Sequence, residues 1–351
     1  MRNFFMRAVS LFLAVLMLSS VVSLASAEGE YAGKELVVAT WGWTAAQVKE
    51  LAKGFEEQTG CTVVIDETSG NADRLNKIAA QKNSPEIDVA LMSESFSMIA
   101  NAQGLFEKID PAIVTNLDAL YDFAKNADGF GPCYSLVRYG ILYNADAVAA
   151  PESYQQLFTD EKYAGLVSIP DMSSTAGPYM LVAMADAMGG SQENVDPAFE
   201  LMAKYKDRIA QFYSTSSEVQ TAFTTGEIAV SVFMDMNIPT LRAAGVNVQW
   251  ADAAEGSFSA AATVNVVKNA PNPTLAQLFV NYMISDEIQN QVADVLKEAP
   301  TNKNAVMSDE AKTYLAYGED SVKALKTLDL DYINAHKAEW IERFQKEVTV
   351  N

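Results

Sequence analysis

The stretch ELVVAT at residues 35–40 is a short apolar β-strand, and it opens the pattern that decides the fold. Helical spacing follows it, with apolar side chains on one face of residues 45–58 and Gly60 as a stop signal. The next predicted elements are strands at residues 62–66 (TVVID) and 87–92 (IDVALM), and helices at residues 73–81 and from about Ser95. This β-α-β-α-β-α order predicts a parallel sheet with helices on both faces.

A second unit of alternating strands and helices follows further along the chain. Thr215 and Glu218 have capping-box spacing, and Pro239 stands where a first helical turn tolerates a missing N–H. Extended apolar segments at residues 139–143 and 263–267 separate the units. Other predicted strands are 166–169, 209–213 and 228–233, and other predicted helices are 179–188, 275–284, 287–296 and 323–346. We therefore predict an α/β fold of two lobes, since 351 residues exceed the usual size of one core.

Residues 1–27 have the three parts of an export signal. Two arginines precede a mostly apolar run at residues 9–22, and the sequence ASA at residues 25–27 is the small-x-small site that signal peptidase cleaves. The run is too short and too interrupted by serines to favour a membrane anchor. Glu28 follows the site in place of a lipid-carrying Cys, so we predict a freely soluble periplasmic protein, with outright secretion as the alternative.

The charge of the chain limits its partners. Forty-five acidic residues against 25 basic ones give a net charge of −20, which repels phosphate backbones. We therefore expect no nucleic-acid partner, and we expect a monomer.

Cys61 and Cys133 could form a disulfide in an oxidising compartment, but the sequence leaves this open. The single histidine, His336, has no Cys or His companion, so we expect no metal site and no cofactor.

Four loops at predicted strand ends carry the candidate ligand-binding residues. In an open parallel sheet, ligands bind outside the carboxyl ends of the strands. Ser95 and Thr175 have a second interpretation as helix N-caps, and one of the two tryptophans could belong to the core. The candidates are Trp41, Trp43, Thr44, Ser93, Glu94, Ser95, Ser173, Ser174, Thr175, Tyr213 and Asp235.

These loops offer both signs of charge. Residues 173–177 precede a predicted helix, whose free N–H groups would attract a carboxylate or phosphate. Glu94, Asp171 and Asp235 would hold an ammonium group, although acids at strand ends are often only solvated caps. A site with both features suits a zwitterion or an organic amine.

Several short segments along the chain have a familiar order and spacing. They are Trp43-Thr44 and residues 55–60 (FEEQTG), 87–90 (IDVA), 103–110 (QGLFEKID), 163–165 (YAG), 225–230 (TGEIAV) and 299–302 (APTN). Together they resemble the periplasmic substrate-binding proteins of ABC importers, in the spermidine/putrescine-type group. The resemblance implies two lobes that close on a ligand and then dock on a membrane permease. It implies a first lobe of residues 28–138 and 263–300, and a second of residues 139–262 and 301–351.

The ligand residues of that group transfer only in part. Trp43, Thr44 and Ser93 match, whereas Ala46 replaces a tyrosine and Met234 replaces an aromatic residue. Residues 260–262 are three alanines where polyamine binders have Trp-x-Asp. The loss of an aromatic box and an acid argues against spermidine itself.

We therefore expect a solute receptor for a small organic amine, zwitterion or carboxylate. A true polyamine binder and a ferric-iron binder of the same fold are alternatives, the latter kept open by Tyr179 and Tyr213. A secreted hydrolase is the alternative from another class. The sequence contains no Gly-x-Ser-x-Gly turn, and only paired-carboxylate hydrolysis stays open. Binding to a membrane chemoreceptor would use the same closed form as import, so the sequence does not separate these two roles.

Overall fold

One mixed sheet runs through the whole protein. The computed structural model describes residues 29–68 and 70–349, so the predicted export signal lies outside the described residues. The strand order is β2-β1-β3-β9-β4-β7-β5-β6, and β8 and β10 both pair with β4. The strands are β1 (Glu35–Trp41), β2 (Thr62–Thr68), β3 (Val89–Ser93), β4 (Cys133–Asn144), β5 (Val167–Pro170), β6 (Ile209–Tyr213), β7 (Val230–Met234), β8 (Val248–Ala251), β9 (Phe258–Val266) and β10 (Ala299–Pro300).

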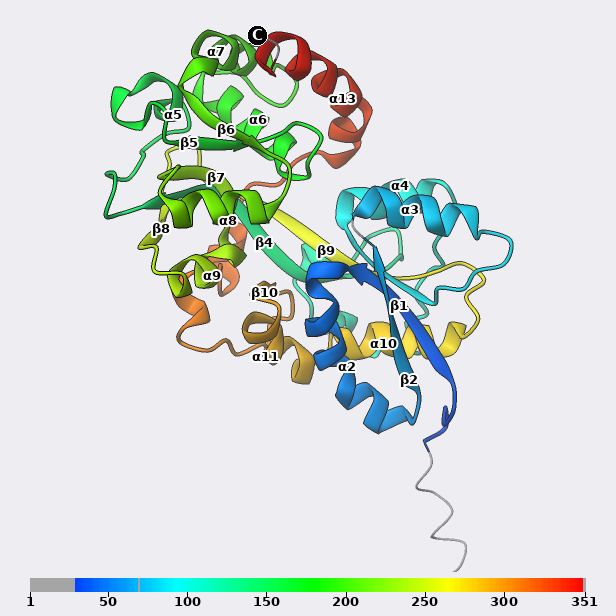
Figure 1. Cartoon of the computed structure of the whole chain (residues 1–351). Helices are drawn as coiled ribbons and strands as arrows, with labels where there is room; N and C mark the ends of the chain where they lie inside the picture. Colours follow the sequence, from blue (N-terminus) through cyan, green and yellow to red (C-terminus); the bar gives the residue numbers. More distant parts are fainter. Residues whose placement is uncertain (1–28, 69, 350–351) are drawn as a thin grey trace, which may run out of the picture.

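Strands β1, β2 and β3 with their helices form what we call the first lobe. All three strands are parallel, as predicted. Alternate side chains of β1 enter different cores: Val38 packs with α2, α10 and α11, and Ala39 packs with α3 and α4. Helices therefore cover both faces (Figure 1). Their bounds are α2 (Ala45–Thr59), α3 (Asn71–Ala80), α4 (Glu94–Ala102), α10 (Pro273–Met283) and α11 (Asp286–Val295).

Strands β5, β6 and β7 with their helices form the second lobe. They too are parallel, and the capping box of Thr215 and Glu218 opens α8 as predicted. Val232 packs in one core with α6, α7 and α13, whereas Phe233 packs on the opposite face with α8 and α9. Pro239 stands in the first turn of α9, as predicted. The helices are α5 (Gln156–Thr159), α6 (Ala176–Ala187), α7 (Asp196–Tyr205), α8 (Ser216–Thr225), α9 (Ile238–Ala243) and α13 (Leu330–Arg343).

Strands β4 and β9 connect the lobes. The first half of β4 pairs with β9 and β10, and its second half pairs with β7 and β8. Strand β9 in turn pairs with β3 of the first lobe, so that the sheet continues without a break (Figure 1). The register of β4 against β9 shifts between Cys133 and Ser135. The two predicted extended segments are thus parts of longer antiparallel strands.

The C-terminal region differs from the single helix predicted at residues 323–346. The structure has two helices here. The short helix α12 (Glu319–Lys323) ends at the residue where the predicted helix would begin, and α13 begins only at Leu330, after the Asp329 N-cap. Between the two helices, Lys326 exchanges backbone hydrogen bonds with the segment around Phe258. This pairing interrupts the predicted helix. The apolar spacing of residues 323–346 contained no sign of the interruption. Ile333 and Trp340 of α13 then pack into the core of the second lobe.

Short turns complete the chain. The 3₁₀ segments are η2 (Gly42–Thr44), η3 (Thr115–Ala119), η4 (Asp122–Ala124), η5 (Glu161–Tyr163), η6 (Lys206–Arg208), η7 (Asp235–Asn237) and η8 (Ala311–Thr313), and a π-helical segment, η9, covers Phe344–Thr349. Cys61 and Cys133 are both buried free thiols, so the disulfide that the sequence left open is not formed.

Candidate functional site

The loop after β1 places its two tryptophans differently. Trp43 is 53% exposed, whereas Trp41 is half-buried against the first-lobe core. Their ring centroids are 5.9 Å apart. Thr44 is buried, and its hydroxyl donates to the Trp41 carbonyl at 3.0 Å and lies 2.9 Å from the Thr40 hydroxyl. Trp43 is therefore the member of this loop with a free apolar face.

The strand end of β3 holds Ser93, Glu94 and Ser95. Helix α4 begins at Glu94, so the N-cap is Ser93 and not Ser95. The Ser93 N–H donates to Asn71 Oδ1 at 3.1 Å, while its buried hydroxyl has no hydrogen-bond partner among the described residues. Burial raises the pKa of Glu94. This strand end thus carries polar groups whose bonding is incomplete.

The polar groups of the loop before α6 are largely hydrogen-bonded to side chains of the same loop. Thr175 stands at the N-cap without a side-chain capping bond. The Ser173 N–H donates to Asp171 Oδ1 at 2.8 Å, and Ser174 Oγ accepts from the Gly177 N–H at 3.2 Å. Asp171 therefore binds its own loop, and part of the predicted anion cradle is already occupied.

Asp235 and Tyr213 are buried in the second lobe. Asp235 accepts from Arg138 Nε at 2.9 Å and from the Arg138 N–H at 3.0 Å. Burial raises the pKa of Asp235, against the lowering effect of Arg138, to about 6. Tyr213 donates its hydroxyl proton to the Val232 carbonyl at 2.7 Å. Asp235 thus offers no free carboxylate, because Arg138 occupies both of its oxygens. No local sequence pattern indicated this partner on β4.

Helix α13 brings the strand-end loops of both lobes together. Asn334 Nδ2 donates to the Ser95 carbonyl of the first lobe at 3.2 Å. Lys337 Nζ donates to the Ser174 carbonyl of the second lobe at 3.2 Å and lies 6.0 Å from the Phe96 ring centroid. Burial lowers the pKa of Lys337. Sequence reasoning missed both residues, since α13 lies far from these loops in the chain.

Two more buried charged residues, Arg74 and Glu298, were not among the predicted site residues. Arg74 of α3 is fully buried, and its guanidinium lies 4.7 Å from the Trp41 ring centroid. Glu298, just before β10, is 5% exposed, and burial raises its pKa to about 7. Burial raises the pKa of Tyr134 on β4, the negative charge of Glu298 raises it further, and the positive charge of Arg74 lowers it. In the sequence, each of them is recognisable only as a charged residue beside a strand. Many surface residues share that feature, so it does not single them out.

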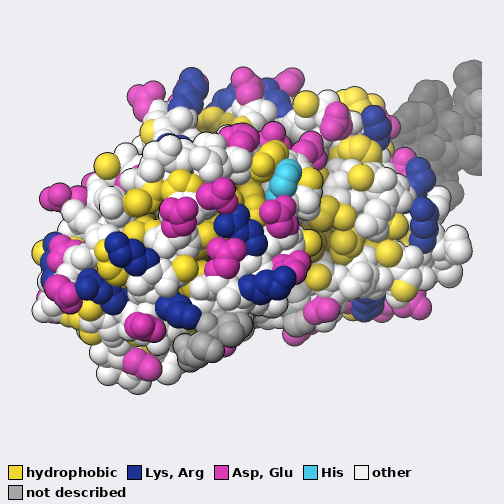
Figure 2. Space-filling model, turned by 90° about the horizontal axis from the view of Figure 1, so that it is seen from above, with side chains coloured by type: hydrophobic (Ala, Val, Ile, Leu, Met, Phe, Trp, Pro, Cys, Tyr) yellow, Lys and Arg dark blue, Asp and Glu magenta, His cyan; other side chains and the backbone are white. Residues whose placement is uncertain are grey.

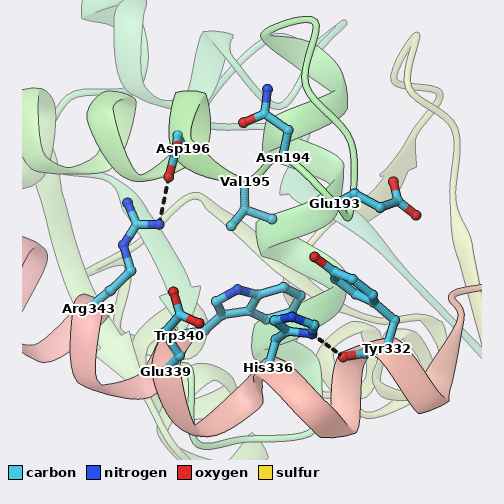
Figure 3. Close-up of a pocket in the computed structure, with 9 residues that line it drawn as sticks. All are labelled: Glu193, Asn194, Val195, Asp196, Tyr332, His336, Glu339, Trp340 and Arg343. Carbon is cyan, nitrogen blue, oxygen red and sulfur yellow. Dashed lines mark hydrogen bonds and ion pairs between the residues drawn. The ribbon is translucent and has the colours of Figure 1, made fainter.

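A separate small pocket lies on the second lobe between the start of α7 and α13 (Figure 3). Tyr332, His336 and Trp340 stack in a row along α13, and Arg343 pairs with Asp196 at 2.7 Å. Its volume of about 120 Å³ is well below that of a usual small-molecule site. It includes none of the predicted residues, so we do not place the solute there.

The sequence model of the family described as bacterial extracellular solute-binding protein matches residues 50–318. The chain belongs to this family. The predicted solute-binding function is therefore confirmed. Among the described residues of the solute-binding protein, no group of three or more His, Cys, Asp and Glu side chains could hold a metal ion, and no helix has the length and apolarity to span a bilayer.

Individual relatives of the solute-binding protein agree with this assignment. It is 24% identical over 303 residues to the putrescine-binding periplasmic protein PotF of Escherichia coli, covering 79% of this chain and 81% of that one. It is 22% identical over 343 residues to a gamma-aminobutyric acid-binding protein of Pseudomonas aeruginosa, covering 91% and 92%.

A solved structure supports the fold. The crystal structure of an ABC transporter protein from Clostridium perfringens is 30% identical, with a TM-score of 0.76, and the match covers 89% of this chain and 99% of that one. The two-lobed α/β architecture predicted from the sequence is thus confirmed.

Proposed function

We propose that this solute-binding protein captures a small organic amine, zwitterion or carboxylate between its lobes and delivers it unchanged to the permease subunits of an ABC importer. The observation that carries the proposal is the contact of α13 with the strand-end loops of both lobes, through Asn334 and Lys337. A solute held there touches both lobes. It therefore favours the closed arrangement by its higher affinity for that state.

The proposed contact residues divide into two groups. In the first group, the exposed ring of Trp43 and the unpartnered hydroxyl of Ser93 would contact the solute, together with Glu94, Ser95 and residues 173–175, whose loops bind α13 through the Ser95 and Ser174 carbonyls. Trp41, Thr44, Tyr213 and Asp235 support these loops through the contacts described above. The lobe boundaries implied by the resemblance belong to the same proposal, with β4 and β9 as the hinge strands.

The printed names of the relatives support an amine-bearing solute, since putrescine and gamma-aminobutyric acid both carry a primary amine. The alanines at 260–262 lie on β9, and Ala262 is the register partner of Ser93. Ala262 occupies the position where polyamine binders carry an acid. Its methyl group thus lies beside the proposed site. A ferric-iron binder is disfavoured, because Tyr213 donates to Val232 and Tyr179 stacks on Tyr139 with centroids 4.8 Å apart.

Export through the signal at residues 1–27, a monomeric state, and the absence of enzymatic activity and of a cofactor are parts of the proposal. Acidic and basic side chains are interspersed over the face seen in Figure 2, and the net charge of −20 disfavours nucleic acid.

Calorimetry of the purified protein tests the proposal. The panel contains putrescine, spermidine, gamma-aminobutyrate, 2-aminoethylphosphonate, succinate and a neutral hexose. We expect binding of at least one charged solute, together with a smaller radius of gyration in solution scattering. Binding of the hexose alone, or turnover of ester or glycoside substrates, would contradict the proposal.

A further inference from the structure

Arg74 is a buried cation without a counter-ion. Its side chain has no exposed surface, and Nη1 donates to the Leu91 carbonyl at 2.8 Å. Nε and Nη2 are buried and have no hydrogen-bond partner among the described residues. No carboxylate of these residues forms an ion pair with it: Asp66, which influences it, is paired with Lys77.

This arrangement is unusual for arginine. Burying a guanidinium is costly unless its N–H groups and its charge are matched. Burial lowers the pKa of Arg74 to about 10, so the group stays charged at neutral pH. The same chain shows the usual solution at Arg138, which pairs with the buried carboxylate of Asp235. Arg74 therefore lacks a partner that Arg138 has.

The position of Arg74 coincides with the place where the sheet opens. Strands β1 and β3 pair only through Val38–Val89 and Ala39–Ala90. Beyond these residues β1 continues beside β2, and β3 continues beside β9. The guanidinium binds Leu91 and stacks on Trp41, and so lies where the two strands part. In open α/β sheets such a point, outside the carboxyl ends of diverging strands, is where ligands bind.

A second residue with an unpartnered polar atom lies at the same strand end. Ser93 follows Leu91 by two residues, and its buried hydroxyl has no partner among the described residues. Asn71, one turn before Arg74 on α3, binds the Ser93 N–H. This bond fixes the start of α3 against the end of β3. Arg74 binds the carbonyl of Leu91 near the end of β3, and Ser93 is the last residue of that strand, so both residues with unpartnered polar atoms lie at one strand end.

Resting on the proposed function, we infer that Arg74 binds an acidic group of the solute, a carboxylate or phosphonate, with Ser93 Oγ as a further donor. An arginine presents Nε and Nη2 on one edge of its plane, which matches two oxygens of such a group. Trp41 covers one face of the guanidinium and so does not occupy this edge. A diamine such as putrescine supplies no oxygen and brings a like charge. The inference therefore selects zwitterions and acids over polyamines among the proposed solutes.

Paired ligands test this inference on the unmodified protein. The calorimetric pairs are gamma-aminobutyrate with 4-aminobutyramide and with putrescine, 2-aminoethylphosphonate with ethanolamine, and succinate with succinamide. We expect each bound acid to bind at least tenfold more tightly than its partner without the acidic group. Equal or tighter binding of the neutral or diamine partner would overturn the inference while leaving the proposed function intact. If no member of the panel binds, the proposed function and the inference with it are overturned.

A substitution of Arg74 provides a second test of the inference. Arg74→Gln keeps hydrogen-bond donors but removes the charge, and we expect the bound acid to bind roughly 10- to 100-fold more weakly. Lys82→Gln, at an exposed position on the same lobe, is the control for the loss of one positive charge. Circular dichroism and thermal unfolding check the fold of both. If Arg74→Gln does not fold, Arg74→Lys replaces it, since it keeps the charge but loses the planar edge with two donors and should also bind the acid more weakly. Unchanged affinity in the folded variant would overturn the inference.

Discussion

Arg138 Nε and Asp235 Oδ2 form an ion pair of 2.9 Å that joins the linking strand β4 to the end of β7. Asp235 is almost fully buried, and the guanidinium of Arg138 also donates to the Tyr314 carbonyl and lies 4.3 Å from the Trp250 ring centroid. The pair therefore connects strands at the center of the second lobe to the C-terminal segment that follows the linking strands.

Asp235→Asn should destabilise the fold. The change leaves Arg138 with an uncompensated charge, and loss of one partner of a buried pair typically costs about 3–5 kcal/mol. Chemical denaturation measures the free energy of unfolding, with Asp331→Asn, an exposed position, as the control. Unchanged stability combined with a selective loss of amine binding would instead identify Asp235 as a ligand residue.

Glu298 should make stability depend on pH. Burial raises its pKa to about 7, so the folded state holds a proton that the unfolded state has released above about pH 5. The contribution of this group to the free energy of unfolding is therefore largest below about pH 5, falls by up to about 3 kcal/mol as the pH rises to about 7, and levels off above that. Glu298→Gln should flatten this decline in denaturation series from pH 5 to 8. Glu227→Gln, at an exposed position, should keep the wild-type slope.

Trp43→Ala should weaken solute binding by about 1–3 kcal/mol, since the exposed ring would be covered by solute. Calorimetry with the solute found in the panel measures the loss. Phe123→Ala is the control, because Phe123 is also exposed but belongs to η4, which is not one of the proposed strand-end loops. Equal affinities of wild type and Trp43→Ala would show that the ring does not contact the solute.

Lys337→Met should favour separation of the lobes. The change keeps most of the length of the side chain but removes the ammonium, which lies 6.0 Å from the ring centroid of Phe96 on the first lobe. We expect roughly fivefold weaker binding and a larger radius of gyration in the presence of solute. Lys323→Met, on α12 and exposed, should have neither effect. An unaltered scattering profile at saturating solute would argue that α13 plays no part in closure.

Cys61 and Cys133 should react with a thiol reagent only on unfolding. Both are buried, and burial raises the pKa of each thiol, which reduces the reactive thiolate. A colorimetric thiol titration should therefore detect two groups in denaturant and almost none in the native protein. Detection of no thiol in denaturant without reductant would indicate a disulfide.

Local patterns predicted the architecture well. Alternation of strands and helices gave both parallel groups, and the Thr215–Glu218 spacing gave the start of α8, because these features depend on residues close in sequence. The site was less predictable. Arg138 meets Asp235 across 97 positions, and Asn334 meets Ser95 across 239. No local pattern encodes such distant partners, and for the same reason Arg74 and Lys337 were missed.

Continuous backbone pairing between the lobes limits how the protein opens. Strands β4 and β9 pair with each other and with strands of both lobes, so rotation of one lobe against the other must twist these two strands instead of flexing a loop. Twisting a paired ribbon while its hydrogen bonds persist meets an elastic resistance that grows with angle. We therefore expect a narrow range of opening angles, and an entrance that admits small metabolites and excludes folded polypeptides.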